Sequence, residues 1–99
     1  MTINKTQDQN ALTLQVEGRL DTVTAPELEA EIKGGLDGAA KLVFDFGRLE
    51  YISSAGLRVL LTAQKAMNKQ GGEMTVTGCS EDILDIFEIT GFSQILTVE

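Results

Sequence analysis

Two adjacent serines, Ser53 and Ser54, are the residues of this chain whose type and position most favour chemistry. They lie in LEYISSAGLRVLL, between an apolar segment typical of a strand and another typical of a helix. A serine before a helix caps a free backbone N–H, and its hydroxyl is also a group that a kinase can phosphorylate. A phosphate there would lie beside the unpaired N–H groups of the helix N-terminus, which stabilise negative charge. The pair therefore predicts a helix cap, a phosphorylation site, or both.

Enzymatic chemistry is not favoured by the remaining residues. A serine nucleophile needs a base, usually histidine, and the chain contains no histidine, no G-x-S-x-G and no Walker-type phosphate loop. Asp21, Asp45 and Glu50 could converge as carboxylates, but 15 acidic residues in 99 make chance pairs common. Cys79 is the only cysteine, so neither an internal disulfide nor a thiolate zinc site is possible. We expect no catalytic residue, no metal and no cofactor.

Charge and hydropathy limit the partners. The net charge is −7 with eight scattered basic residues, which argues against nucleic-acid binding. The N-terminus is polar and shows no secretory signal, and no apolar run approaches the ~18 residues that a membrane span needs. These observations predict a cytoplasmic protein that does not insert directly into a membrane.

Hydrophobic periodicity predicts alternating strands and helices. Strands are expected at MTINKTQ, ALTLQVEG, KLVFDF, EMTVTG and QILTV. Helices are expected at TAPELEAEIKGGL, from Ala55 to the glycines of KQGGE, and at SEDILDIFEIT. Thr24 and Glu27 have capping-box spacing, Ser80 is a good N-cap, and Gly91 is a good helix end. The order β-β-α-β-α-β-α-β predicts one α/β domain over residues 1–99, with a mostly parallel sheet of about five strands and helices mainly on one face.

The stretch FDFGRLEYISSAGLRVLL resembles the signature of STAS domains, specifically the bacterial anti-sigma-factor antagonists. In that signature an apolar strand ends in Asp, and an aromatic-apolar-Asp-Ser-Ser/Thr-Gly-Leu run then opens a helix. Upstream, VEGRLDTVTAPELEAEI resembles the family's G-E-L/I-D-x-x-T-A-x-x-L segment. Downstream, NKQGGEMTVTGCSEDILDIFEITGFSQIL resembles its K-x-x-G-G strand and its helix ending in T/S-G-L/F. The resemblance covers nearly the whole chain and implies the STAS fold.

The resemblance also implies a function in transcription regulation called partner switching. The unphosphorylated antagonist binds an anti-sigma factor that is also a serine kinase, and this frees a sigma factor. The kinase then phosphorylates the antagonist with ATP and releases it, and a serine phosphatase resets the cycle. The acceptor corresponds to Ser54 here, with Ser53 as second choice. The residues implied to flank the acceptor or contact the partner are Asp21, Asp45, Ser53, Ala55, Gly56, Leu57 and Arg58.

Three positions depart from the family pattern. Ser53 stands where Asp is usual, Ala55 where Ser or Thr follows the acceptor, and Arg19 where Glu is common. The first change removes a carboxylate and adds a second hydroxyl beside the acceptor. An alternative function is therefore a non-switching STAS adaptor subunit of a larger assembly, such as a lipid-transport ATPase or a stress-sensing complex.

Overall fold

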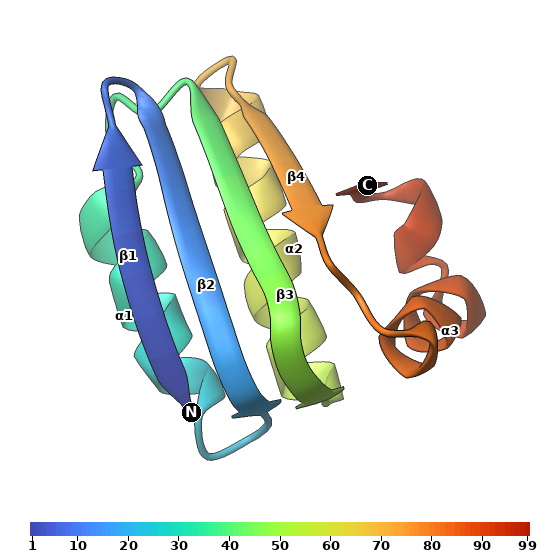
Figure 1. Ribbon diagram of the computed structural model, residues 1–99. Coiled ribbons are helices and arrows are strands. Elements are labelled where there is room, and N and C mark those ends of the chain that lie inside the picture. The colour runs from blue at the N-terminus through green and yellow to red at the C-terminus, as the bar shows by residue number, and fades with distance from the viewer.

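The computed structural model describes residues 1–99 as a five-stranded sheet with three α-helices and a short 3-10 helix (Figure 1). The strands are β1 (Thr2–Asp8), β2 (Ala11–Leu20), β3 (Lys41–Ile52), β4 (Glu73–Thr77) and β5 (Thr97–Val98). The helices are α1 (Ala25–Gly35), α2 (Ser54–Lys69), α3 (Glu81–Thr90) and the 3-10 helix η1 (Phe92–Gln94). The predicted order of strands and α-helices is confirmed.

The sheet has the strand order β1-β2-β3-β4-β5. β1 and β2 form an antiparallel hairpin, and each later pair of neighbours is parallel. Parallel neighbours need a crossover, and α1, α2 and α3 supply one each. In Figure 1, α1 and α2 lie behind the sheet, and α3 lies beyond β4 at its edge. This architecture confirms the predicted, mostly parallel sheet with helices mainly on one face.

The core lies between the sheet and the helices that cover it. In β2, Leu12, Leu14 and Val16 are buried, and the polar residues between them are partly exposed on the other face. This alternation follows from the two-residue period of a strand. Leu28 and Ile32 of α1, one helical turn apart, face the same core. The period of the apolar residues in each segment therefore sets which side of the element is covered.

β3 is longer than the sequence predicted, because it continues past KLVFDF to Ile52. Its buried residues first alternate and then recur every third residue, at Phe46, Leu49 and Ile52. The cause is two register shifts against β2, at each of which β3 contains one extra residue. These bulges keep the apolar side chains on the core face and bring Ser53 to the end of β2, where its N–H donates to the Leu20 carbonyl at 2.9 Å.

The helix caps confirm two predictions and correct a third. The Ser80 hydroxyl accepts a hydrogen bond from the first turn of α3 at 3.3 Å, and Gly91 ends that helix with a φ of 82°. The predicted capping box of Thr24 and Glu27 is wrong, since Thr24 makes no side-chain cap bond to α1. Its hydroxyl instead accepts the backbone N–H of Asp21 at 2.8 Å, so the loop before α1 uses that oxygen.

The C-terminal segment also differs from its prediction as a strand over QILTV. Only Thr97–Val98 pairs with β4. The preceding residues curl into η1, and the N–H groups of Ile95 and Leu96 both donate to the Phe92 carbonyl, at 3.0 and 2.8 Å. A left-handed Gly91 starts this turn directly after α3, which leaves little chain for a strand.

Candidate functional site

The two serines differ in what their hydroxyls do. Ser53 is the partly buried N-cap of α2, and its Oγ accepts the Gly56 N–H at 3.4 Å. Its carbonyl accepts the Leu57 N–H at 2.9 Å. Ser54 is the first residue of α2, is exposed, and makes no side-chain hydrogen bond within the protein. The helix thus begins one residue before the predicted Ala55, and only the Ser54 hydroxyl is free.

Gly56 lets α2 approach the sheet closely at this point. A Cβ on Gly56 would lie 2.7 Å from Leu20 Cγ and 2.8 Å from Ile52 Cγ1, and both distances are shorter than a van der Waals contact between carbon atoms. The first turn of α2 is therefore pressed against the ends of β2 and β3. The next residue, Leu57, is buried in the core, which fixes the rotation of the helix and leaves Ser54 facing outward.

Asp21 lies at the same sheet edge as the serines, directly after β2. The Thr24 backbone N–H donates to its carboxylate at 3.1 Å, and this bond is the main cause that lowers the pKa of Asp21 below its usual value. The Val23 N–H adds a second bond at 3.0 Å, and Arg19 Nε lies 3.7 Å from the other carboxylate oxygen. The Arg19 guanidinium also stacks 4.2 Å above the Tyr51 ring. Asp21 is thus an ionised group that shapes the loop.

The structure does not bring Asp45 to the serines, which corrects the expectation that it lies near the acceptor. Its Oδ1 accepts the Gly47 N–H at 2.9 Å, in the middle of β3. The β2 partners of Asp45 and Ile52 are five residues apart, which corresponds to roughly 17 Å of strand. The separation follows from the continuation of β3 beyond the point where its sequence pattern indicated an end.

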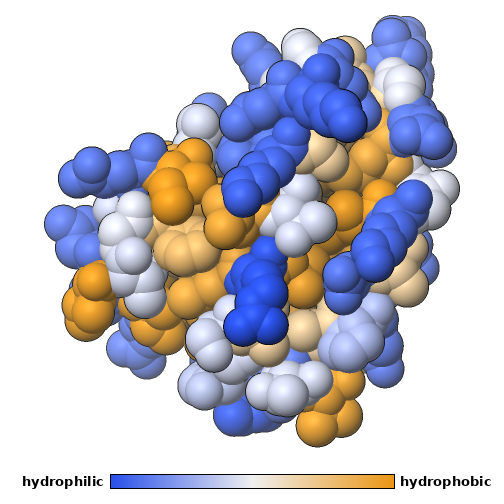
Figure 2. All heavy atoms as spheres, turned by 180° about the vertical axis from the view of Figure 1, so that it is seen from behind, coloured by the Kyte–Doolittle hydropathy of each residue, from blue (hydrophilic) through white to orange (hydrophobic).

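Two shallow pockets flank the N-terminal half of α2. The α1-side pocket, of about 240 Å³, lies between α1 and α2 and includes Glu29, Ala55 and Arg58. The α3-side pocket, of about 350 Å³, is lined by Ser54, Leu57, Arg58, Leu61, Thr90 and Phe92. Figure 2 shows the helical face, where apolar surface in orange lies between polar side chains in blue. Arg58 is the residue that lines both pockets.

Several residues at this end were not indicated by the sequence pattern. Leu61 and Phe92 form apolar walls of the α3-side pocket, and Phe92 comes from a segment expected to precede a strand. Val23, in the loop after β2, is 83% exposed. The sequence could have indicated an exposed Val23 only because it is an apolar residue in an otherwise polar loop. Phe92 matches the last residue of the T/S-G-L/F segment, but that pattern does not indicate that it lies beside α2.

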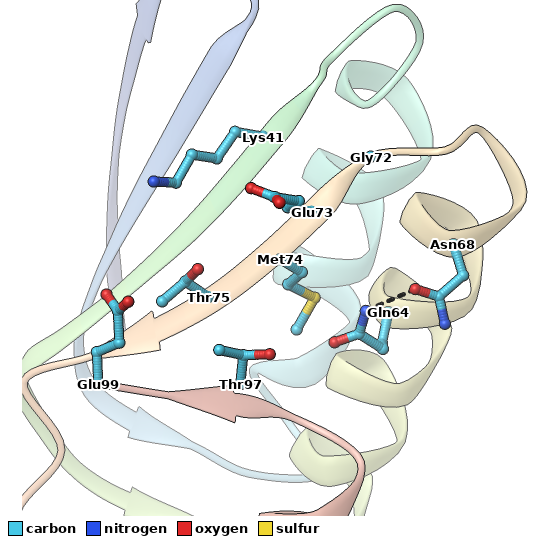
Figure 3. Close-up of a pocket in the computed structure, with 9 residues that line it drawn as sticks. All are labelled: Lys41, Gln64, Asn68, Gly72, Glu73, Met74, Thr75, Thr97 and Glu99. Atoms are coloured by element: carbon cyan, nitrogen blue, oxygen red, sulfur yellow. Dashed lines mark hydrogen bonds between the residues drawn. The ribbon is translucent and has the colours of Figure 1, made fainter.

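A larger cavity, of about 380 Å³, lies toward the other end of α2, beside β4 (Figure 3). Figure 3 shows Gln64 and Asn68 on α2 with their side-chain amides joined by a hydrogen bond, which measures 3.0 Å. The Gln64 carbonyl oxygen is buried and has no partner. β5 pairs only with Thr75 and Val76, so β4 has a free edge at this cavity. None of the residues predicted for the site lines it.

Cys79 and the potential metal-ligating side chains are the other candidates for a reactive site. Burial raises the pKa of Cys79 to about 11, so its thiol stays protonated at neutral pH. No group of three or more histidine, cysteine, aspartate or glutamate side chains is arranged to hold a metal ion. No helix combines the length and apolar character needed to cross a membrane.

Comparison with known proteins identifies the family of this chain. The family model of the STAS domain matches residues 2–99. This chain belongs to the STAS domain family. BtrV of Bordetella bronchiseptica, named as an anti-sigma factor antagonist, is 39% identical over 84 residues, which cover 84% of this STAS domain and 72% of BtrV. The anti-sigma-B factor antagonist of Staphylococcus aureus is 30% identical over 99 residues, which cover 99% of this chain and 92% of that protein.

Solved structures share the fold of this STAS domain. The Bacillus cell fate determinant SpoIIAA in its phosphorylated form has a TM-score of 0.78 at 17% identity. The match covers 99% of this chain and 91% of SpoIIAA. The five-stranded mixed sheet and its three helices are therefore the STAS fold, and the relatives place the chain among the anti-sigma factor antagonists.

Proposed function

We propose that this STAS domain binds a kinase-type anti-sigma factor through the N-terminal half of α2 and is released when Ser54 is phosphorylated. The observation that carries the proposal is the division of roles between the two serines. Ser53 caps α2, and Ser54 presents an exposed hydroxyl that makes no internal bond. A kinase can modify Ser54 without breaking the cap. The names of the relatives and the phosphorylated form of SpoIIAA support this assignment.

The surface around Ser54 suits a protein partner. Leu61 and Phe92 give the α3-side pocket partly exposed apolar walls, and Val23 exposes a further apolar side chain in the loop after β2. Burial of such surface stabilises a complex by about 25 cal/mol per Å². Arg58, which lines both pockets, adds a positive charge that a carboxylate of the partner would satisfy. The partner is thus expected to offer apolar side chains around an acidic one.

The other predicted residues contribute in different ways. Gly56 and Leu57 are buried, so they position the surface and offer the partner little area. Ala55 is partly buried and lines the α1-side pocket, where it can be contacted. Asp21 holds the loop that carries the exposed Val23.

Release follows from the charge that phosphorylation adds. The γ-phosphoryl group of ATP passes to Ser54 Oγ, ADP leaves, and the hydroxyl proton passes to the kinase. The product carries about −1.5 to −2 charges. An unpaired charge in a desolvated contact costs several kcal/mol, and each 1.4 kcal/mol is tenfold in affinity. One phosphate therefore weakens binding by about 100-fold or more, and a serine phosphatase restores it.

The test is phosphopeptide mass spectrometry on the protein from its own host, reading the peptide that contains both serines. Phosphate is expected on Ser54. Ser54→Ala should abolish phosphate incorporation and keep binding to the anti-sigma factor, whereas Ser54→Asp should weaken that binding. Ser53→Ala is the matched control, because it removes the neighbouring hydroxyl and leaves the proposed acceptor in place.

Two outcomes would contradict the proposal. Full phosphate incorporation in Ser54→Ala would move the acceptor to Ser53. No phosphate under any growth condition, with the protein held in a stable complex, would favour the alternative of a fixed STAS adaptor in a lipid-transport ATPase or stress-sensing assembly.

A further inference from the structure

Arg58 is the arginine of this chain that lacks a counter-ion. The chain has three arginines, and the other two are paired. Arg19 lies 3.7 Å from Asp21, and Arg48 lies 3.4 Å from Glu17. Arg58 is exposed, forms no ion pair within 4.0 Å, and stacks on no aromatic ring. An exposed guanidinium that forms no ion pair is available to bind an anionic group that is added nearby.

Arg58 is also placed to reach Ser54. It follows Ser54 by four residues on α2, and side chains with that spacing lie on the same helix face with Cβ atoms about 6 Å apart. Both residues line the α3-side pocket. The other lining residues are uncharged: Leu57, Leu61, Thr90 and Phe92. Arg58 is thus the one charged side chain that lines this pocket with the free hydroxyl.

The carboxylate that could compete for Arg58 lies on the opposite side. Glu29 of α1 lines the α1-side pocket together with Arg58. It already has a cation, because Lys33 Nζ lies 3.4 Å from Glu29 Oε1. A phosphate carries nearly twice the charge of a carboxylate and three acceptor oxygens, which suits bidentate hydrogen bonds from a guanidinium.

We propose that Arg58 is the intramolecular partner of the phosphate on Ser54. In the modified protein the guanidinium lies over the α3-side pocket and binds the phosphate oxygens. Phosphorylation then acts twice on the same surface: it adds negative charge, and it removes the free arginine from a bound partner's carboxylate. This inference rests on the proposed function only in that a kinase supplies the phosphate in the cell. The pairing between Arg58 and the phosphate depends on this chain alone.

The test uses the full chain with phosphoserine incorporated at position 54 during translation, so that no kinase is needed. Titration by ³¹P NMR gives the second pKa of the phosphate in the parent and in Arg58→Gln. An arginine beside the phosphate favours its dianion, so we expect the pKa to be lower in the parent by about half a unit or more. Arg58→Lys, which keeps the charge, should restore part of this shift.

Arg48→Gln is the matched control, because it removes an arginine that is paired with Glu17 on β2 and lines neither pocket. It should leave the phosphate pKa unchanged. Equal pKa values in the parent and Arg58→Gln, or an equal shift in Arg48→Gln, would overturn the pairing. Failure of the proposed function would give a different result. The protein from its own host would carry no phosphate on Ser54, while the difference in phosphate pKa between the parent and Arg58→Gln would still be measured.

Discussion

The two ends of α2 each adjoin a cavity, and they differ in what lines it. At the C-terminal half, Gln64 and Asn68 bond to one another beside a cavity of about 380 Å³. At the N-terminal half, Ser54 and Arg58 lie beside a pocket of about 350 Å³ and make no side-chain hydrogen bond or ion pair. The larger cavity also has charged lining residues that form no ion pair, Lys41, Glu73 and Glu99, but Met74 is its one apolar lining residue.

Cavity size alone therefore does not single out the N-terminal end of α2. A crossover helix that meets a short edge strand leaves space simply because β5 covers only part of β4. The N-terminal end, by contrast, combines a serine hydroxyl at the helix start, an unpaired arginine and the apolar walls of Leu57, Leu61 and Phe92. This combination of residues separates the two ends better than volume does.

Gly56→Ala should have the largest effect on stability and would sharpen the contrast between the two ends. The added Cβ would lie within 2.8 Å of two core side chains, so we expect a loss of about 1–3 kcal/mol in the free energy of unfolding. Urea denaturation measures it. Gly34→Ala is the control, because nothing lies within 4 Å of that position on α1 and a gain of about 0.4–1 kcal/mol is expected. Equal effects would mean that α2 is not pressed against the sheet.

Ser53→Ala should have a smaller effect on stability, and it separates the role of the cap from that of the proposed acceptor, Ser54. The variant loses the bond to the Gly56 N–H, so we expect a loss of about 1 kcal/mol in the free energy of unfolding. Ser80→Ala, which removes the equivalent cap of α3, should cost a similar amount. Thermal unfolding gives both values. A stability unchanged by Ser53→Ala would show that the hydroxyl of Ser53 is as free as that of Ser54.

Gln64→Leu should have the smallest effect on stability, and it tests whether the larger cavity takes part in the function. The change removes a buried carbonyl oxygen that has no partner, and the hydrogen bond that it also removes is to Asn68, which is exposed and can bond to water instead. The free energy of unfolding should therefore stay level or rise by up to about 1 kcal/mol. Phosphate incorporation and partner binding should not change. Gln64→Glu is the control, since it places a carboxylate in the same buried position and should destabilise the fold. Loss of partner binding in Gln64→Leu would assign the larger cavity to the function.

Much of the fold followed from local patterns, and the failures lie where long-range pairing overrides them. The alternation in β2 and the cap at Ser80 are local, and both predictions were right. The predicted end of β3 was wrong because two bulges change the spacing of its buried side chains from every second to every third residue. The capping box predicted at Thr24 was wrong because its hydroxyl accepts the Asp21 N–H in the preceding loop and makes no bond to α1.

The sequence by itself determined the order of elements, the sheet type and the position of the serine pair at a helix start, because periodicity and capping act over a few neighbouring residues. Only the tertiary structure decided which serine is the cap and which is free, because the register of β3 against β2 and the close contact at Gly56 set the rotation of α2. It also decided that Asp45 lies far from the serines and that Phe92 lies beside them, since both depend on packing between segments distant in the chain.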